Sequence, residues 1–192
     1  KTALSLNIRT GMSKVARSMP MMHTSQYLAM RRESLNNDGL EPSMTPSRPG
    51  YAPDLLRFDT TRSVDWKAYF LGGTAHTTDF NVNLSGGTAN LQFLVGAGYQ
   101  KEGFIIPGDF KNERGSFNSN LRHHSADNRF SFDLTVHYSY NGNNSSGSPD
   151  ALKAFALAPN YPELMDPDGN LIWMYNGVIL SDNPMAYLRQ KY

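Results

Sequence analysis

Five stretches of this chain alternate apolar and polar residues with a period of two. The clearest covers residues 129–141, where Phe130, Phe132, Leu134, Val136, Tyr138 and Tyr140 alternate with Ser131, Asp133, Thr135, His137 and Ser139. Successive side chains of a strand point to opposite faces of a sheet, so the pattern predicts a strand with one apolar and one polar face. The other four predicted strands lie near residues 2–13, 78–86, 90–100 and 113–124. The chain is therefore expected to be all-β, a meander of about five long strands.

The length of these strands favours a membrane. They run for about 9 to 13 residues, whereas soluble strands most often have about 5 or 6 and a tilted strand crossing a bilayer needs about 9 to 11. Charged residues make up only 18% of the chain, below the usual quarter, and uncharged polar residues replace them. This composition suits a sheet that faces lipid on one side and a watery lumen on the other. It predicts part of a transmembrane antiparallel β-barrel.

The connections between the predicted strands alternate in length. Residues 86–89 and 125–128 read as tight turns, whereas residues 14–77, 101–112 and 142–192 are long. Outer-membrane barrels alternate short periplasmic turns with long extracellular loops, so the first, third and fifth strands are expected to run outward. Within the long loops, one short helix is expected to begin after Thr24 or Ser25 as N-cap and to stop at Asn36, Asn37 and Gly39, and two more are expected over residues 149–157 and 184–190.

Two global features exclude other classes of protein. The formal net charge is +1, so there is no excess positive charge to attract nucleic acid, and no nucleic-acid partner is expected. No run of 18 or more apolar residues occurs, which excludes a transmembrane helix. The chain has no cysteine, so disulfides and thiolate metal sites are excluded as well.

The residues that could carry chemistry do not form a convincing catalytic or metal site. Asp166, Asp168 and Asn170 imitate the opening of a calcium loop, but Leu171 and Gly177 stand where that motif requires Gly and Glu, so a turn is predicted. His123 and His124 are neighbours on a strand and point to opposite faces, which argues against a shared metal ion. The carboxylates Glu33, Asp54, Asp59 and Asp65 have no spacing that fixes a catalytic pair. We expect no enzyme and no cofactor.

Trp66 and Tyr69 are the candidate ligand-binding residues of the chain. Exposed aromatic rings in an extracellular loop can stack on a sugar ring. The competing interpretation, which the sequence favours, is that both rings pack against the body of their own loop.

Several motifs resemble the SusC/RagA-like family of TonB-linked outer-membrane transporters. The most specific block is residues 81–88, Asn-Val-Asn-Leu-Ser-Gly-Gly-Thr, followed by Gly-Ala-Gly-Tyr at 96–99 and Glu-Gly-Phe-Ile-Ile at 102–106. Residues 63–66 resemble the family's Asp-Trp segment, although Lys67 and Ala68 replace its usual polar and acidic pair. Residues 158–160, 166–170 and 182–186 are similar to successive landmarks of one family loop.

The resemblance implies that residues 1–192 are the N-terminal part of a barrel domain that follows an absent plug domain. It further implies import of oligosaccharides or peptides across the outer membrane of a Gram-negative cell. The implied partners are a SusD-like surface lipoprotein, TonB through the missing N-terminal region, and outer-membrane lipid. No ligand residue is carried over from the family. A secreted or surface-attached carbohydrate-binding β-sandwich is the alternative, and a porin without plug or energy coupling is a third possibility.

Overall fold

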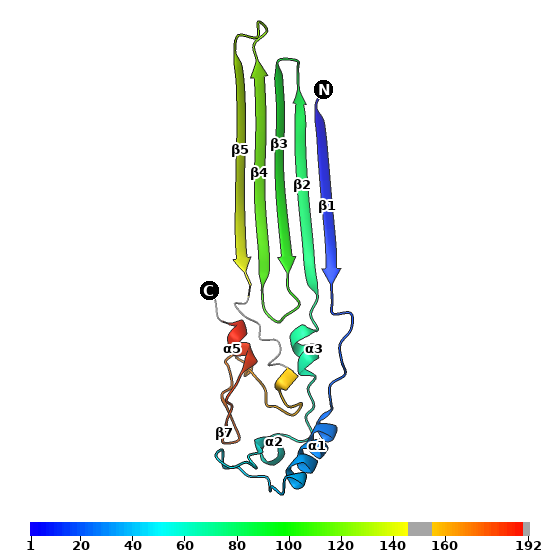
Figure 1. Cartoon of the computed structure of the whole chain (residues 1–192), viewed down its shortest axis with the longest axis vertical. Helices are drawn as coiled ribbons and strands as arrows, with labels where there is room; N and C mark the ends of the chain where they lie inside the picture. The colour runs from blue at the N-terminus through cyan, green and yellow to red at the C-terminus, as the bar shows by residue number, and fades with distance from the viewer. Residues whose placement is uncertain (146–154, 190–192) are drawn as a thin grey trace. The chain divides into compact units, whose positions relative to one another are not determined.

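A computed structural model describes residues 1–145 and 155–189 of the chain (Figure 1). They form two compact units. The sheet unit comprises Lys1–Lys14, Thr74–Ile105 and Asp109–Ser145, and the loop unit comprises Val15–Gly73, Ile106–Gly108 and the described part of Ser146–Tyr192. Within the described ranges, no helix has both the length and the apolar character needed to cross a bilayer.

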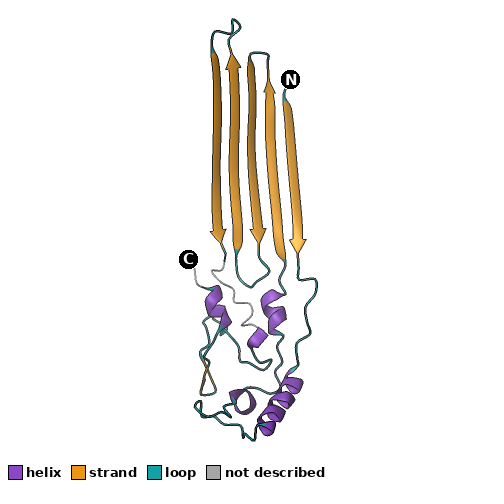
Figure 2. Cartoon of the chain, viewed as in Figure 1, coloured by secondary structure: helices purple, strands orange, loops and turns teal. Residues whose placement is uncertain are grey.

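The sheet unit is a single antiparallel meander of five strands (Figure 2). The strands lie side by side in sequence order: β1 (Ala3–Ser13), β2 (Ala75–Gly87), β3 (Leu91–Gly103), β4 (Lys111–His124) and β5 (Ser131–Asn144). The predicted all-β meander of five long strands is thereby confirmed. β2 begins at Ala75 and β3 ends at Gly103, about three residues beyond the apolar alternation, with Thr77 still paired to Glu102. Backbone hydrogen bonds continue the ladder there, and they require no apolar side chain.

The residues of the two tight turns fit the backbone conformations that these turns require. After β2, Gly87 adopts φ +150°, and the Thr88 N–H donates to the Leu91 carbonyl at 2.6 Å. An added Cβ at Gly87 would collide with that carbonyl, so glycine is required. Between β4 and β5, Asn128 adopts φ +56°. There Asp127 accepts from the Ser125 hydroxyl at 2.5 Å, and this bond lowers the pKa of Asp127.

The loop unit carries short helices and one small hairpin. Its elements are α1 (Thr24–Asn37), α2 (Pro53–Leu56), α3 (Trp66–Leu71), the strands β6 (Met174–Tyr175) and β7 (Val178–Ile179), and α5 (Pro184–Leu188). The helix expected over residues 184–190 is α5, which is slightly shorter. The helix expected over residues 149–157 lies largely outside the described residues.

The start of α1 differs from the prediction. His23 is the N-cap, and its backbone N–H donates to Gln26 Oε1 at 3.2 Å. Thr24 is instead buried inside the unit, where its hydroxyl donates to the Arg62 carbonyl at 2.6 Å. Threonine is a favoured N-cap residue, but Thr24 makes a tertiary contact instead of capping α1. The predicted end of this helix is confirmed, since Gly39 adopts φ +66° and the Leu40 N–H donates to the Leu35 carbonyl.

Two small apolar clusters hold the loop unit together. One comprises Leu28, Leu35, Ala52 and Leu55, and the other comprises Phe58, Val178 and Leu180. Beside the first cluster, buried Asp54 accepts from the Tyr27 hydroxyl at 3.0 Å and from Arg31 Nε at 3.2 Å. Burial, and then the charge of Asp54, raise the pKa of Tyr27 to about 12. A unit with such small cores depends on these buried polar contacts for its shape.

Candidate functional site

One face of the five-stranded sheet is apolar across every strand. The register places Leu6, Val82, Ala97, Phe117 and Tyr138 in a single row across β1 to β5. Rows on either side add Ile8, Phe80, Tyr99 and Tyr140, and Leu4, Leu84, Val95 and Val136. Many of these side chains are exposed, among them Leu6 at 58% and Tyr138 at 66%. A contiguous apolar surface of this extent marks a contact with lipid or protein.

The opposite face is polar and crowded at two glycines. Asn83, Gly96, Asn118 and His137 form one row of this face, and Asn81, Gly98, Ser116 and Ser139 form the next. A Cβ added at Gly96 would lie 2.5 Å from Asn118 Oδ1 and 2.6 Å from Asn83 Oδ1. The glycines of β3 thus allow side-chain amides from β2 and β4 to close over the middle of the sheet.

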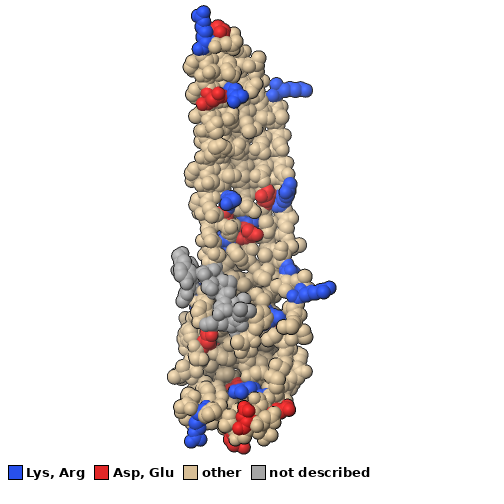
Figure 3. Space-filling model, in the orientation of Figure 1, with Lys and Arg blue, Asp and Glu red and all other residues tan. Residues whose placement is uncertain are grey.

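Charged side chains of β4 and β5 lie toward the ends of these strands, whereas Arg9 and Asp79 lie opposite each other farther inside β1 and β2, on the polar face. Residues 115–121 of β4 and 134–144 of β5 contain no Lys, Arg, Asp or Glu. At one end of this uncharged band, Arg122 pairs with Asp133 at 2.7 Å, and at the other end Lys111 pairs with Glu113 at 3.3 Å. On the face shown in Figure 3, charged side chains flank this band. A charge-free band between charged ends is the pattern expected of strands that cross a bilayer.

Both edges of the sheet are open within the described residues. β1 pairs with β2 and β5 pairs with β4, and no described strand pairs with the outer side of either. Unpaired backbone groups along an edge cannot be left in hydrocarbon. If the apolar face meets lipid, further strands must continue the sheet on both sides.

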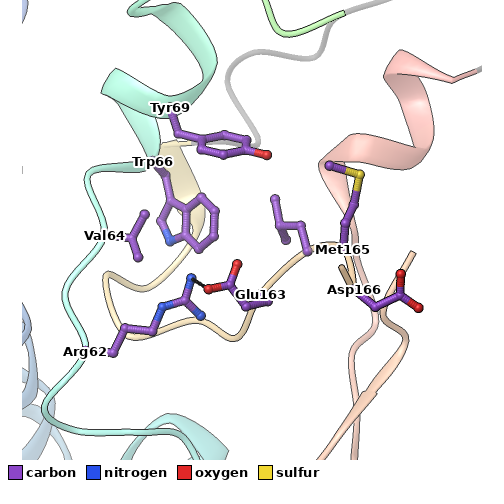
Figure 4. Close-up of a pocket in the computed structure, with 8 residues that line it drawn as sticks. Arg62, Val64, Trp66, Tyr69, Glu163, Met165 and Asp166 are labelled. Atoms are coloured by element: carbon purple, nitrogen blue, oxygen red, sulfur yellow. Dashed lines mark ion pairs between the residues drawn. The ribbon is translucent and has the colours of Figure 1, made fainter. Parts of the chain in front are cut away.

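The loop unit contains a pocket lined by an aromatic pair and an ion pair (Figure 4). Its volume is about 240 Å³, and its lining consists of Arg62, Val64, Trp66, Tyr69 and residues 163–166. Arg62 Nη2 lies 2.9 Å from Glu163 Oε1, and the guanidinium lies over the Trp66 ring, 5.7 Å from its centroid. These residues come from segments about a hundred positions apart in the sequence.

The structure gives the two candidate aromatic residues different surroundings. Trp66 is 3% exposed, its indole Nε1 donates to the Ala158 carbonyl at 2.9 Å, and its ring meets Tyr161 edge-on. It therefore packs within the loop unit. Tyr69 contacts Trp66 edge-on at 5.6 Å but is 42% exposed, with its hydroxyl toward the pocket in Figure 4. Of the two, only Tyr69 has an exposed ring.

Of the four carboxylates considered for a catalytic pair, Asp54, Asp59 and Asp65 each accept hydrogen bonds. Asp54 is buried against α1, Asp65 caps α3 by accepting from the Ala68 N–H at 2.9 Å, and Asp59 accepts from the Thr61 N–H at 2.8 Å. The predicted turn at residues 166–170 is confirmed, because Asp166 Oδ1 accepts from the Asn170 N–H at 2.7 Å.

The histidines do not gather at one point of the sheet. His123 pairs with Phe132 and His124 with Ser131, while His137 lies opposite Asn118, six positions along β5 from Ser131. In the described part of the chain, no three His, Cys, Asp or Glu residues are grouped to hold a metal ion.

Sequence reasoning did not identify Arg62 or Glu163 as pocket residues. Neither residue belongs to a recognisable motif, and 100 residues separate them in the chain. Only Trp66 and Tyr69, as aromatic residues in a predicted loop, pointed to this region. The pairing depends on tertiary packing, which no local pattern encodes.

The geometry of the sheet defines a structural class. An open antiparallel meander of long strands, with one exposed apolar face and one polar face, has the architecture of a segment of an outer-membrane β-barrel. A chain of the RagAB peptide importer, solved in its closed-closed state, shares the fold with a TM-score of 0.57 and 18% sequence identity. The match covers 91% of this chain and 22% of the importer chain. It confirms, at the level of the fold, the predicted resemblance to the SusC/RagA-like transporters. No protein-family model and no curated protein sequence matches the chain.

Proposed function

We propose that this chain is the first part of the barrel domain of a TonB-dependent transporter in the outer membrane of a Gram-negative cell. The observation that carries the proposal is the exposed apolar face that continues across all five strands and carries no charge at its centre. In water, such a face would drive aggregation, whereas hydrocarbon solvates it. The fold shared with the RagAB importer chain supports the same conclusion.

The proposal accounts for both open edges and for the loop unit. Further strands of the same barrel extend the sheet beyond β1 and β5, and a plug domain precedes the barrel and couples to TonB. The polar face lines the lumen. The connections at residues 14–74 and 104–110 and the described residues after β5 are extracellular, and most of them belong to the loop unit. This arrangement makes the protein a transporter and not an enzyme.

The proposed cargo is a peptide or an oligosaccharide, delivered with a SusD-like surface lipoprotein. The similar solved structure is a peptide importer, which favours a peptide cargo here. A carbohydrate-binding sandwich would require a second sheet on the apolar face. Within the sheet unit, as far as the structure describes it, that face has no such cover.

Uptake in cells tests the proposed function. A strain that lacks the gene should no longer accumulate fluorescent peptides or fluorescent oligosaccharides, and the intact gene should restore uptake of one of the two. The tagged protein should fractionate with the outer membrane and co-purify with a lipoprotein. Recovery of the protein in the soluble fraction, with uptake of both probe sets unchanged in the deletion strain, would contradict the proposal.

A further inference from the structure

Arg62 presents a fixed cation at the wall of the pocket in the loop unit. Its Nη1 donates to the Tyr161 carbonyl at 3.1 Å, and its guanidinium lies over the Trp66 ring. The side chain is only 22% exposed. Because an aromatic face and a carbonyl hold the guanidinium in place, little conformational freedom is lost when an anion binds to its remaining N–H groups.

Glu163, by contrast, is a loosely held partner of this cation. Its side chain is 69% exposed, and it contacts Arg62 at 2.9 Å. An ion pair with an exposed carboxylate contributes little stability. The nearby acidic residues Asp59, Asp65 and Asp166 are each occupied by hydrogen bonds from their own turns. A carboxylate from outside the protein can therefore replace Glu163 without leaving a second buried anion beside Arg62.

The rest of the pocket is small and mostly apolar. Val64, Tyr69, Leu164 and Met165 line it together with Asp166, whose carboxylate accepts hydrogen bonds from Asn170 (Figure 4). Leu164 is buried, whereas Tyr69 stands half-exposed at the mouth. The volume of about 240 Å³ lies below the range of roughly 300 to 1,000 Å³ that is common for drug-sized ligands. The space suits one carboxylate and one apolar side chain of moderate size.

We propose that this pocket binds a carboxylate that carries an apolar group. The carboxylate accepts hydrogen bonds from Arg62 in place of Glu163, and the apolar group contacts Tyr69, Leu164 and Met165. Glu163 occupies the anion position when no ligand is bound and acts as an internal competitor. This inference goes beyond the proposed function, because it concerns binding in the loop unit whether or not the protein transports a cargo.

Calorimetric titration of the purified full-length protein in detergent tests the proposal. N-acetyl-leucine supplies the carboxylate and the apolar group, and N-acetyl-leucinamide is the matched neutral probe. We expect the acid to bind and the amide to bind at least about tenfold more weakly, because charge-assisted hydrogen bonds to arginine are lost. Equal affinity for the two probes, or no binding of the acid, would overturn the proposal.

Two substitutions distinguish competition from a purely structural ion pair. Glu163→Gln removes the competitor and should tighten binding of the acid about threefold, whereas Arg62→Gln should weaken it by about tenfold or more. Arg48→Gln removes an exposed arginine of the same unit and should leave the affinity unchanged. If Glu163→Gln fails to tighten binding, the proposed competition is wrong. The titration of Glu163→Gln tests the proposed competition even if Arg62→Gln does not fold. It does not depend on uptake, so its outcome is independent of the proposed transport function.

Discussion

Single residues on the polar face of the sheet determine how closely its strands can pack. Gly96 lies on β3 where Asn83 and Asn118 converge from the neighbouring strands, and a Cβ there would come within 2.6 Å of both amide oxygens. Gly115 of β4 lies in the row of Tyr99 and Tyr140 on the apolar face, and a Cβ added there would have the Cβ of Tyr140 at 4.0 Å as its nearest neighbour. Of these two glycines, only Gly96 is required for steric reasons.

Substituting these glycines separates a steric requirement from ordinary strand propensity. Gly96→Ala should lower the free energy of unfolding by about 1 to 3 kcal/mol, because the flanking amides must move. Gly115→Ala should be neutral or stabilising by up to about 1 kcal/mol, since alanine restricts the unfolded chain at no steric cost. Urea unfolding of the full-length protein in lipid measures both values. Equal effects of the two substitutions would mean that the amides do not close over Gly96.

Tyr27 should titrate well above an ordinary tyrosine. Burial and the nearby Asp54 carboxylate raise its pKa to about 12. An unfolded tyrosine ionises near pH 10, so the neutral phenol stabilises the fold below pH 10, and this contribution is lost as pH rises from about 10 to about 12. Solvent screening of the partly buried ring limits the loss to the order of 1 kcal/mol.

The difference in phenolate absorbance between the wild type and Tyr27→Phe isolates this titration. Asp54→Asn should lower the pKa of Tyr27, because it removes the charge that disfavours the phenolate. A Tyr27 that titrates near pH 10 in the folded wild type would contradict the buried contact with Asp54.

At the scale of elements, buried asparagines connect segments that have little apolar surface of their own. Asn183 is 1% exposed and is the N-cap of α5, accepting from the Met185 N–H at 3.1 Å. Its Nδ2 donates to the Leu164 carbonyl at 2.7 Å and to the Ile172 carbonyl at 3.1 Å. One amide thus fixes α5 against two other segments of the loop unit.

Asn183→Asp tests the donor role of this amide. The aspartate keeps the cap but cannot donate, and it places a carboxylate against two carbonyl oxygens, so we expect a loss of about 3 kcal/mol or more. Asn183→Ser, which keeps a shorter cap and one donor, should cost less. Thermal unfolding followed by near-ultraviolet circular dichroism compares the two. A milder effect of aspartate than of serine would exclude the donor role.

The strands of the sheet can be predicted from the sequence more fully than the contacts of the loop unit. The period-two runs predicted all five strands because alternation is a local property, and each strand of this sheet has one face that is mostly apolar, although Gly115 and Ser119 interrupt that face on β4. The ends of β2 and β3 were missed because backbone pairing continues past the alternating residues. In the loop unit, Thr24 was expected to cap α1, but burial against the Arg62 carbonyl has priority over its capping preference. The Arg62–Glu163 contact depends on long-range packing and left no local signal.

For the whole molecule, the proposed transporter predicts that charge is tolerated on one face of the sheet only. Val82 and Asn83 are neighbours on β2, and their side chains point to opposite faces. Val82→Arg places a charge toward hydrocarbon and should destabilise the protein by about 2 to 4 kcal/mol, or prevent its assembly. Asn83→Arg places the same charge toward the lumen and should cost less. Surface labelling of cells measures the assembly of the two variants, and unfolding in lipid vesicles measures their stability. If Asn83→Arg loses as much stability or assembly as Val82→Arg, the assignment of faces is contradicted.

The most direct test of the transporter proposal is the environment of the apolar face in the intact protein. Spin labels at residues 80, 93 and 132 replace Phe80, Phe93 and Phe132 on that face, and a label at Asn118 serves as the matched control on the other face. The chain has no cysteine, so each introduced thiol is unique within it. In lipid bilayers, the three labels should collide with dissolved oxygen and be shielded from a water-soluble nickel complex, whereas the label at residue 118 should not report hydrocarbon. Labels at residues 80, 93 and 132 that all collide freely with the nickel complex would contradict a lipid-facing sheet and, with it, the proposed transporter.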